Sequence, residues 1–170
     1  MSSMNCRLII SNYFLDVSKW IIHTQPKCNI GSKLLIIFKR ANEVEELVRT
    51  GQVVNAVASS ALLETLFFKN SPLHDGAVIV SGNQVVAARC ILPVTSRTDI
   101  DPNLGLRHRS AIGVTEQLDV ISVIVSEETG AISYAIGGEI HHDVTPVQLR
   151  HALEKYINQT GAEEVEKSEN

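Results

Sequence analysis

The sequence predicts a single α/β domain with a mixed β-sheet and flanking helices. Apolar runs of strand length alternate with amphipathic helical patterns, and two strand–turn–strand signals lie among them. Hairpins join antiparallel strands, whereas strands that alternate with helices favour parallel pairing, so the sheet should contain both kinds. The 170 residues, 44% of them hydrophobic, suit one globular domain with short end segments.

The first part of the chain is predicted to alternate helix and strand. Apolar residues at helical spacing predict an amphipathic helix from about Leu8 to Thr24, which Pro26 ends. Residues 33–40 (KLLIIFKR) have the continuous apolar centre of a strand buried on both faces. The next predicted elements are a short helix opened by a capping box of Asn42 and Glu45 and ended by Gly51, a strand over Val53–Val57, and a helix over Ala61–Phe68 capped by Ser59 or Ser60.

The second part begins with a predicted hairpin. Its turn, Ser81-Gly82-Asn83, joins Ala77–Val80 to a strand that starts at Val85 and continues to about Leu92. Polar residues and two prolines make 93–104 a loop, and 161–170 is predicted to be disordered. The other predicted elements are a helix from about Arg107 to Glu116, strands over Val120–Val125 and Ala131–Ile136 around the turn Glu127–Gly130, and a final helix from Thr145-Pro146 to about Ile157.

Composition argues against several classes of partner. The formal net charge of −4 lacks the basic excess of a nucleic-acid binder, and 5% aromatic residues are few for stacking single-stranded bases. No apolar run approaches the roughly 20 residues of a membrane span, and the N-terminus lacks a secretory signal. Cys6, Cys28 and Cys90 have no metal spacing and cannot all pair, which favours a cytoplasmic protein. A membrane-anchored parent protein is compatible with these observations.

The first segment that offers chemistry is Ser71-Pro72-Leu73-His74-Asp75-Gly76-Ala77, which leads into a predicted buried strand. Asp75 and His74 offer oxygen and nitrogen ligands to a divalent cation, and Gly76 permits a close backbone approach to a ligand. Such a segment suits a metal-bound nucleotide. An ordinary Asp-Gly turn beside a surface histidine is the alternative from spacing alone.

The second segment is Gly105-Leu106-Arg107-His108-Arg109-Ser110, at the predicted start of a helix. Free N–H groups at a helix N-terminus attract anions, and arginine grips phosphate oxygens bidentately. Consecutive helical residues point about 100° apart, so Arg107, His108 and Arg109 suit an extended polyphosphate. A solvated basic turn is the alternative.

A third segment, Ser126-Glu127-Glu128-Thr129-Gly130, follows an apolar strand. Ligands of open α/β sheets commonly lie beyond the carboxyl ends of strands, so Ser126 and Glu127 are candidates for contact with a phosphate or its metal. An acidic hairpin turn is the alternative. His141-His142-Asp143 is interpreted as a polar loop rather than a metal site, because adjacent histidines on a strand face opposite sides.

Together LHDGA, GLRHR and VSEETG, in this order and spacing, resemble the diadenylate cyclase domain, a bacterial family that makes the second messenger cyclic di-AMP from two ATP molecules. The resemblance covers about residues 30–155 and includes Ile91-Leu92-Pro93. It implies a twisted mixed sheet flanked by helices. We therefore expect an N-terminal helix in 1–29, a diadenylate cyclase domain in 30–158 and an acidic, disordered tail in 159–170.

The resemblance also implies residue roles. Asp75 would bind catalytic Mg²⁺ or Mn²⁺ near the attacking 3′-hydroxyl, with His74 as a further ligand. Arg107, His108 and Arg109 would hold the triphosphate. The remaining ATP-binding candidates are Gly76, Ala77, Leu92, Gly105, Leu106, Ser110, Ser126 and Glu127.

One departure from the family pattern concerns Leu106, where many members have threonine before the Arg-His-Arg run. The missing hydroxyl puts one phosphate contact in doubt. A sensor that binds ATP without turnover is therefore the alternative function. Since each domain would hold one ATP, the cyclase interpretation requires a face-to-face homodimer. The N-terminal helix is expected to cover the core or, alternatively, to hold the domains in a higher, inactive oligomer.

Overall fold

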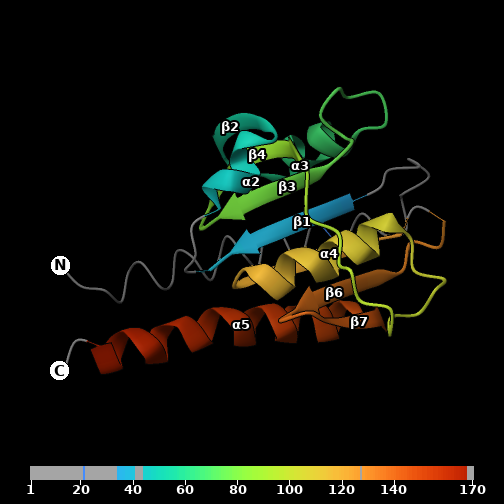
Figure 1. Ribbon diagram of the computed structural model, residues 1–170. Helices are drawn as coiled ribbons and strands as arrows, with labels where there is room; N and C mark the ends of the chain where they lie inside the picture. The colour runs from blue at the N-terminus through green and yellow to red at the C-terminus, as the bar shows by residue number, and fades with distance from the viewer. Residues whose placement is uncertain (1–20, 22–33, 41–43, 127, 168–170) are drawn as a thin grey trace.

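The computed structural model describes Ile21 and residues 34–40, 44–126 and 128–167. A seven-stranded sheet forms its centre, in the order β2-β4-β3-β1-β5-β6-β7 (Figure 1). β1 pairs with β3 in parallel, and the other neighbouring pairs of the sheet are antiparallel. The predicted mixed α/β sheet is therefore confirmed.

The predicted strands and helices are largely found where the sequence places them. The strands are β1 (Leu34–Lys39), β2 (Gln52–Val57), β3 (Ala77–Ser81), β4 (Gln84–Cys90), β5 (Val120–Val125), β6 (Ile132–Ile136) and β7 (Glu139–Val144). The helices are α2 (Glu45–Arg49), α3 (Ser60–Phe67), α4 (Leu106–Gln117) and α5 (Pro146–Lys167).

Helix capping agrees with the sequence at two starts. Ser59 caps α3, because its hydroxyl accepts a hydrogen bond from the Leu62 amide at 3.2 Å. Thr145 and Gln148 form a reciprocal capping box at the start of α5. At α2 the structure gives Val44 as the N-cap with no side-chain bond. Asn42, Cys6, Cys28 and the predicted helix over 8–24, apart from Ile21, lie outside the described residues.

Two predictions near the C-terminus are wrong. Residues 141–143, interpreted as a polar loop, belong to β7, an edge strand whose polar side chains hide its period. Its signal was Gly137-Gly138, which turns the β6–β7 hairpin with φ of +56° and +82°. The sequence also predicts that the final helix ends near Ile157 and that a disordered tail follows, whereas α5 runs to Lys167. Residues 162–167 (AEEVEK) are mostly strong helix formers, and one interior glycine costs only about 1 kcal/mol.

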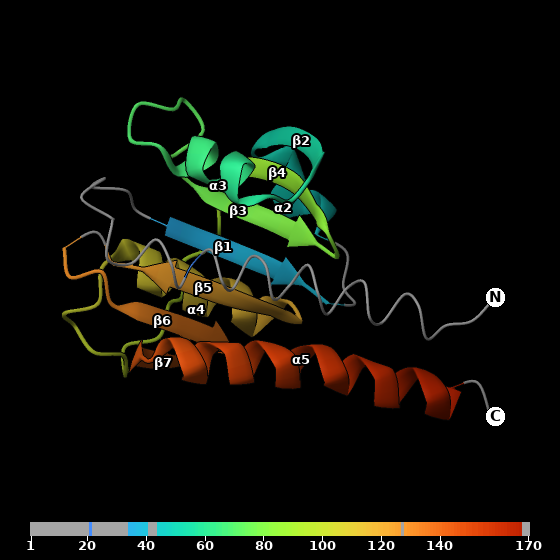
Figure 2. The ribbon, with the colours of Figure 1, turned by 180° about the vertical axis from the view of Figure 1, so that it is seen from behind.

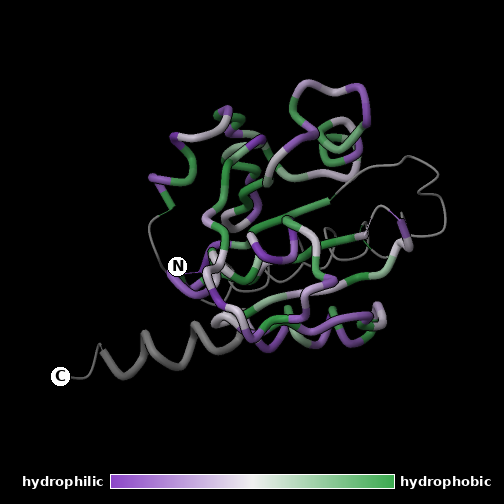
Figure 3. The backbone as a smooth tube through the Cα atoms, turned by 45° about the vertical axis from the view of Figure 1, so that its right-hand side comes forward, coloured by the Kyte–Doolittle hydropathy of each residue, from purple (hydrophilic) through white to green (hydrophobic). Residues whose placement is uncertain are grey.

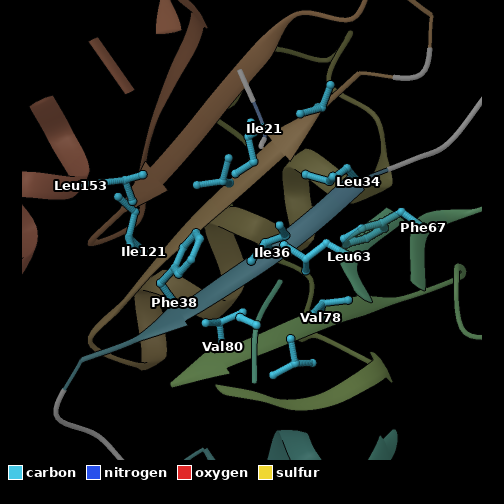
Figure 4. Close-up of a cluster of buried hydrophobic side chains, with 14 of the residues drawn as sticks. Ile21, Leu34, Ile36, Phe38, Leu63, Phe67, Val78, Val80, Ile121 and Leu153 are labelled. Carbon is cyan, nitrogen blue, oxygen red and sulfur yellow. The ribbon is translucent and has the colours of Figure 1, made fainter. Parts of the chain in front are cut away.

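The sheet buries both faces, which explains the unbroken apolar run of β1. Leu34, Ile36 and Phe38 point into one core cluster, and Leu35 and Ile37 into the other. The first cluster lies against α3 and α5 (Figure 4), and the second lies against α2 and α4. α4 is accordingly in front of the sheet in Figure 1 and behind it in Figure 2. The strands at the centre of the molecule are hydrophobic (Figure 3).

The loop over 93–104, which the sequence predicts, is fastened along α4. The Thr95 amide donates to the Arg109 carbonyl at 3.1 Å, and the Thr95 hydroxyl donates to Glu116 Oε1 at 2.8 Å. Gly113 makes this approach possible, because a Cβ there would lie 2.4 Å from the Pro93 carbonyl oxygen and 2.6 Å from the Thr95 nitrogen. The loop and the helix therefore hold each other in place.

This contact predicts the sign of one substitution. Glycine to alanine inside a helix normally stabilises it by about 1 kcal/mol. For Gly113→Ala we expect instead a loss of about 1–3 kcal/mol in the free energy of unfolding, because the new methyl group meets backbone atoms that cannot rotate away. Urea denaturation measures the change. A variant more stable than the parent would contradict the packing.

Candidate functional site

The strand pairing brings the three motifs to one end of the sheet. Ala77, the first residue of β3, pairs with Cys90, the last of β4. Leu34, the first residue of β1, pairs with Val125, the last of β5, and β1 is parallel to β3. The segments before β3, after β4 and after β5 therefore lie together at what we call the motif end. α4 begins there as well, because it leads directly to the start of β5 at the opposite end.

An ion pair joins the first two motifs at the motif end. Arg107 Nη2 donates to Asp75 Oδ1 at 3.0 Å across 32 positions of sequence. The Asp75 side chain is 81% exposed and that of Arg107 is 21% exposed. The carboxylate thus faces solvent, while the guanidinium that holds it is largely enclosed. Two segments that the sequence separates form one polar site.

Gly76 fixes the backbone beside this carboxylate. It has φ of +131°, and an added Cβ would lie 2.7 Å from the Cα and carbonyl carbon of Arg89. Arg89 itself has φ of +57°, where the β3–β4 pairing is irregular. A residue without a side chain is required here, because the position is both crowded and left-handed. The local sequence around Arg89 does not predict this bulge.

His74 is oriented by its own loop. Its Nδ1 lies 2.6 Å from the Ser71 carbonyl oxygen, which accepts the ring proton when Nδ1 carries it. The Ser71 hydroxyl accepts a bond from the Leu73 amide at 3.2 Å. In that tautomer Nε2 carries the lone pair, an arrangement typical of metal-binding histidines.

The Arg-His-Arg run points in three directions, as consecutive helical residues must. Arg107 reaches Asp75, the His108 ring lies 5.6 Å from the His142 ring, and Arg109 Nε donates to the Leu104 carbonyl at 3.2 Å. Gly105 is the N-cap and supplies no side-chain bond to the first turn of α4. Backbone N–H groups and two guanidinium groups therefore gather at one helix start, which suits an anion.

The other candidates differ in exposure. Ala77 is fully buried, and Leu92 and Ser110 are nearly so, whereas the Leu106 side chain is 69% exposed. Leu92 packs in the core cluster beneath α4. The Ser126 hydroxyl accepts from the Thr129 amide at 3.3 Å within the turn after β5. Glu127 lies outside the described residues, and Glu128 is exposed.

Sequence reasoning missed the environment of His108. Burial lowers the pKa of His108, a charged His142 lowers it further, and Asp143 opposes both effects. His142 comes from β7, the strand that the sequence analysis interpreted as a loop. Its neighbour His141 stacks on Tyr134 with ring centroids 4.6 Å apart, whereas His142 Nδ1 lies 3.4 Å from the Ser133 hydroxyl. The two histidines thus face opposite sides of the sheet, as expected.

The residues at the motif end fit a divalent cation that arrives with a nucleotide. Asp75 supplies an exposed carboxylate, and His74 supplies a ring whose Nδ1 is already engaged. Among the described residues no group of three or more His, Cys, Asp or Glu side chains is arranged to hold a metal. Magnesium commonly takes one or two carboxylates and completes its shell with water and substrate phosphates. The donor set agrees with that pattern.

Comparison with known proteins agrees with the motifs. Residues 26–140 match the DAC family model, described as DisA bacterial checkpoint controller nucleotide-binding. The diadenylate cyclase CdaS of Bacillus thuringiensis is 47% identical over 63% of this chain and 53% of its own length. The cyclic di-AMP synthase CdaA of Bacillus subtilis is 42% identical over 78% of this chain and 48% of its own length. The chain therefore spans about half the length of these relatives.

Solved structures share the fold. DacA from Staphylococcus aureus, crystallised as a double mutant, superposes with a TM-score of 0.79 at 33% identity, over 86% of this chain and 95% of that one. A hypothetical membrane-spanning protein from Bacillus cereus gives a TM-score of 0.70 at 40% identity, over 76% and 62%. Within the described part of this chain, no helix has both the length and the hydrophobicity to cross a membrane. By family model, sequence identity and fold, the chain belongs to the DAC family, the diadenylate cyclase domain that its three motifs resemble.

Proposed function

We propose that this domain joins two ATP molecules into cyclic di-AMP and releases two pyrophosphates. The observation that carries the proposal is the Arg107–Asp75 ion pair, which unites an acidic and a basic motif at one exposed end of the sheet. Relatives named as diadenylate cyclases or cyclic di-AMP synthases, at 41–47% identity, support the same reaction. In it, the 3′-hydroxyl of one ATP displaces pyrophosphate from the α-phosphate of the other.

The side chains divide the work of this phosphoryl transfer. Arg107 and Arg109 bind the triphosphate and offset the charge that develops on the pyrophosphate, while His108 donates a hydrogen bond to it. Asp75, which faces solvent and is held by Arg107, would lie close to the attacking 3′-hydroxyl. Gly76 lets the backbone approach the nucleotide. Ser126 contributes a contact from the turn after β5, and Glu127, the next residue in the sequence, is a further candidate.

Asp75, with His74 beside it, would hold Mg²⁺ or Mn²⁺. When bound, the cation supplies Lewis-acid polarisation of the phosphate and lowers the pKa of the attacking hydroxyl. Asp75 would hold the cation through its exposed carboxylate, and Arg107 would then be available to the phosphates. The Ser71 carbonyl oxygen, 2.6 Å from Nδ1, orients the His74 ring.

The reaction needs two domains. Each chain presents one copy of each motif, whereas the product ring contains two equivalent phosphodiester links. Exposed apolar residues lie at the start of α4 and on the segment that follows β4. They are Leu106 (69% exposed), Ile91 (70%) and Val94 (48%). This surface supports a face-to-face homodimer in which the two nucleotides meet at the interface.

The catalytic proposal predicts that Asp75→Asn abolishes turnover. The amide cannot carry the charge that holds a cation, so we expect product formation from ATP with Mn²⁺ or Mg²⁺ to fall by about 10²-fold or more. Because Asp75 is exposed, the fold should survive. Glu64→Gln, which changes an exposed carboxylate on α3, is the matched control and should keep full activity. Chromatography of the nucleotides gives the readout, beside a measurement of ATP binding.

Two outcomes contradict this proposal. Near-normal activity of Asp75→Asn removes that residue from its role. ATP binding by the parent chain without any cyclic di-AMP, at high protein concentration and with either ion, identifies a sensor in place of a cyclase.

The dimer proposal predicts that activity per chain rises with protein concentration until the dimer saturates. Ile91→Glu should shift this rise to higher concentration, because it puts a charge into the interface without disturbing the core. Val57→Glu is the control, since Val57 is 54% exposed but pairs with Gln84 at the opposite end of the sheet. Light scattering measures the oligomeric state of each variant, and the nucleotide assay measures its activity at the same concentrations. A concentration-independent specific activity in a monomeric sample would refute the dimer.

A further inference from the structure

The Arg-His-Arg motif contacts a strand that lies outside the three motifs. His108, in the first turn of α4, faces His142 on β7 with ring centroids 5.6 Å apart and planes inclined by 45°. This separation lies within the range in which aromatic rings attract each other, about 4.5–7 Å. The contact spans two elements that are distant in sequence and meet only through the fold.

β7 is held so that His142 points toward α4. Gly137-Gly138 sets the β6–β7 register, and Tyr134 pairs with His141 on the strand. The Gly138 amide donates to the Thr115 hydroxyl of α4 at 3.1 Å, which ties the start of β7 to the end of the helix. The Ser133 hydroxyl lies 3.4 Å from His142 Nδ1 on the same face. The strand is therefore tied to α4 at its start and to β6 beside His142.

The polar and charged groups that we consider around the His108 ring come from three elements. On β7 they are His142 and Asp143, on β6 the nearby polar group is the uncharged Ser133, and on α4 the neighbours are Arg107 and Arg109. Burial and the His142 charge lower the pKa of His108, and Asp143 only partly opposes them. Near neutral pH the ring is then uncharged, with one N–H donor and one lone pair. The arginines carry the positive charge of the motif.

We propose that His142 is a positioning residue of this site, whose ring packs against His108 and holds that imidazole beside Arg107 and Arg109. The inference rests on the proposed function, because it assigns His108 to the nucleotide triphosphate. His142 contacts the His108 ring, so the effect on the nucleotide that we assign to it is an indirect one, through His108. A strand without any of the three motifs thereby contributes to binding.

Three variants of the full chain separate this role from a structural one. His142→Ala removes the ring, and we expect kcat/KM for ATP to fall about two- to tenfold, as the loss of an aromatic pair predicts. His142→Phe keeps a ring without a charge and should stay within about twofold of the parent. His141→Ala is the matched control, because the neighbouring ring stacks on Tyr134 on the other face and should leave kcat/KM unchanged.

The second readout is NMR titration of the imidazole groups without nucleotide or metal. The pKa of His108 should rise in His142→Ala and in His142→Phe, because both remove a charge that opposes its protonation. His141→Ala should leave it where it is. This measurement requires no enzymatic activity, so it tests the contact even where the parent chain makes no cyclic di-AMP. In that case ATP affinity from calorimetry replaces kcat/KM for the same three variants.

The outcomes separate clearly. The proposal is supported when His142→Ala lowers kcat/KM, His142→Phe restores it, and both raise the His108 pKa. It is overturned when His142→Ala and His141→Ala behave alike in both readouts, which describes a merely structural strand. Equal losses in His142→Ala and His142→Phe also overturn it, because ring packing is then not what positions His108.

Discussion

The pairing of β1 with two neighbours of opposite direction is the constraint on which the rest of the structure depends. β1 runs parallel to β3 and antiparallel to β5, so the start of β3 and the end of β5 meet at one end of the sheet. The register cannot slip by one residue, because alternate side chains of β1 fill two separate cores. The same backbone hydrogen bonds that stabilise the sheet therefore bring Asp75, Ser126 and the first turn of α4 together.

Around this frame the site is held by a few tight local contacts. Gly76 and the left-handed Arg89 fit against each other, so the backbone before β3 has little freedom. On the other side, Gly113 lets the loop after β4 lie directly on α4, and Thr95 bonds to both ends of that helix. The charged side chains are then presented from rigid backbone, with Asp75 itself left exposed. Such preorganisation suits a reaction in which positioning and charge compensation do most of the work.

Much of the fold could be predicted from local patterns, and the exceptions have physical causes. The apolar runs at 34–39 and 120–125 predict buried strands. A strand that is buried on both faces needs apolar residues on both, so it shows no alternation of apolar and polar residues. β7 lacks such a run, since it is an exposed edge, and its signal lay in Gly137-Gly138. The three motif segments were singled out by their chemistry, whereas the role of each residue came from the family resemblance. The Arg107–Asp75 and His108–His142 contacts depend on tertiary pairing and had no local signal.

The central claim is that the motif end of one chain is a complete half-site for one nucleotide. A crystal structure of the chain with a non-hydrolysable ATP analogue and Mn²⁺ tests it most directly. The account predicts one analogue per chain, its triphosphate against Arg107 and Arg109 and its metal on Asp75, with two chains facing each other. A nucleotide bound away from the start of α4, or triphosphate contacts that omit both arginines, would contradict it.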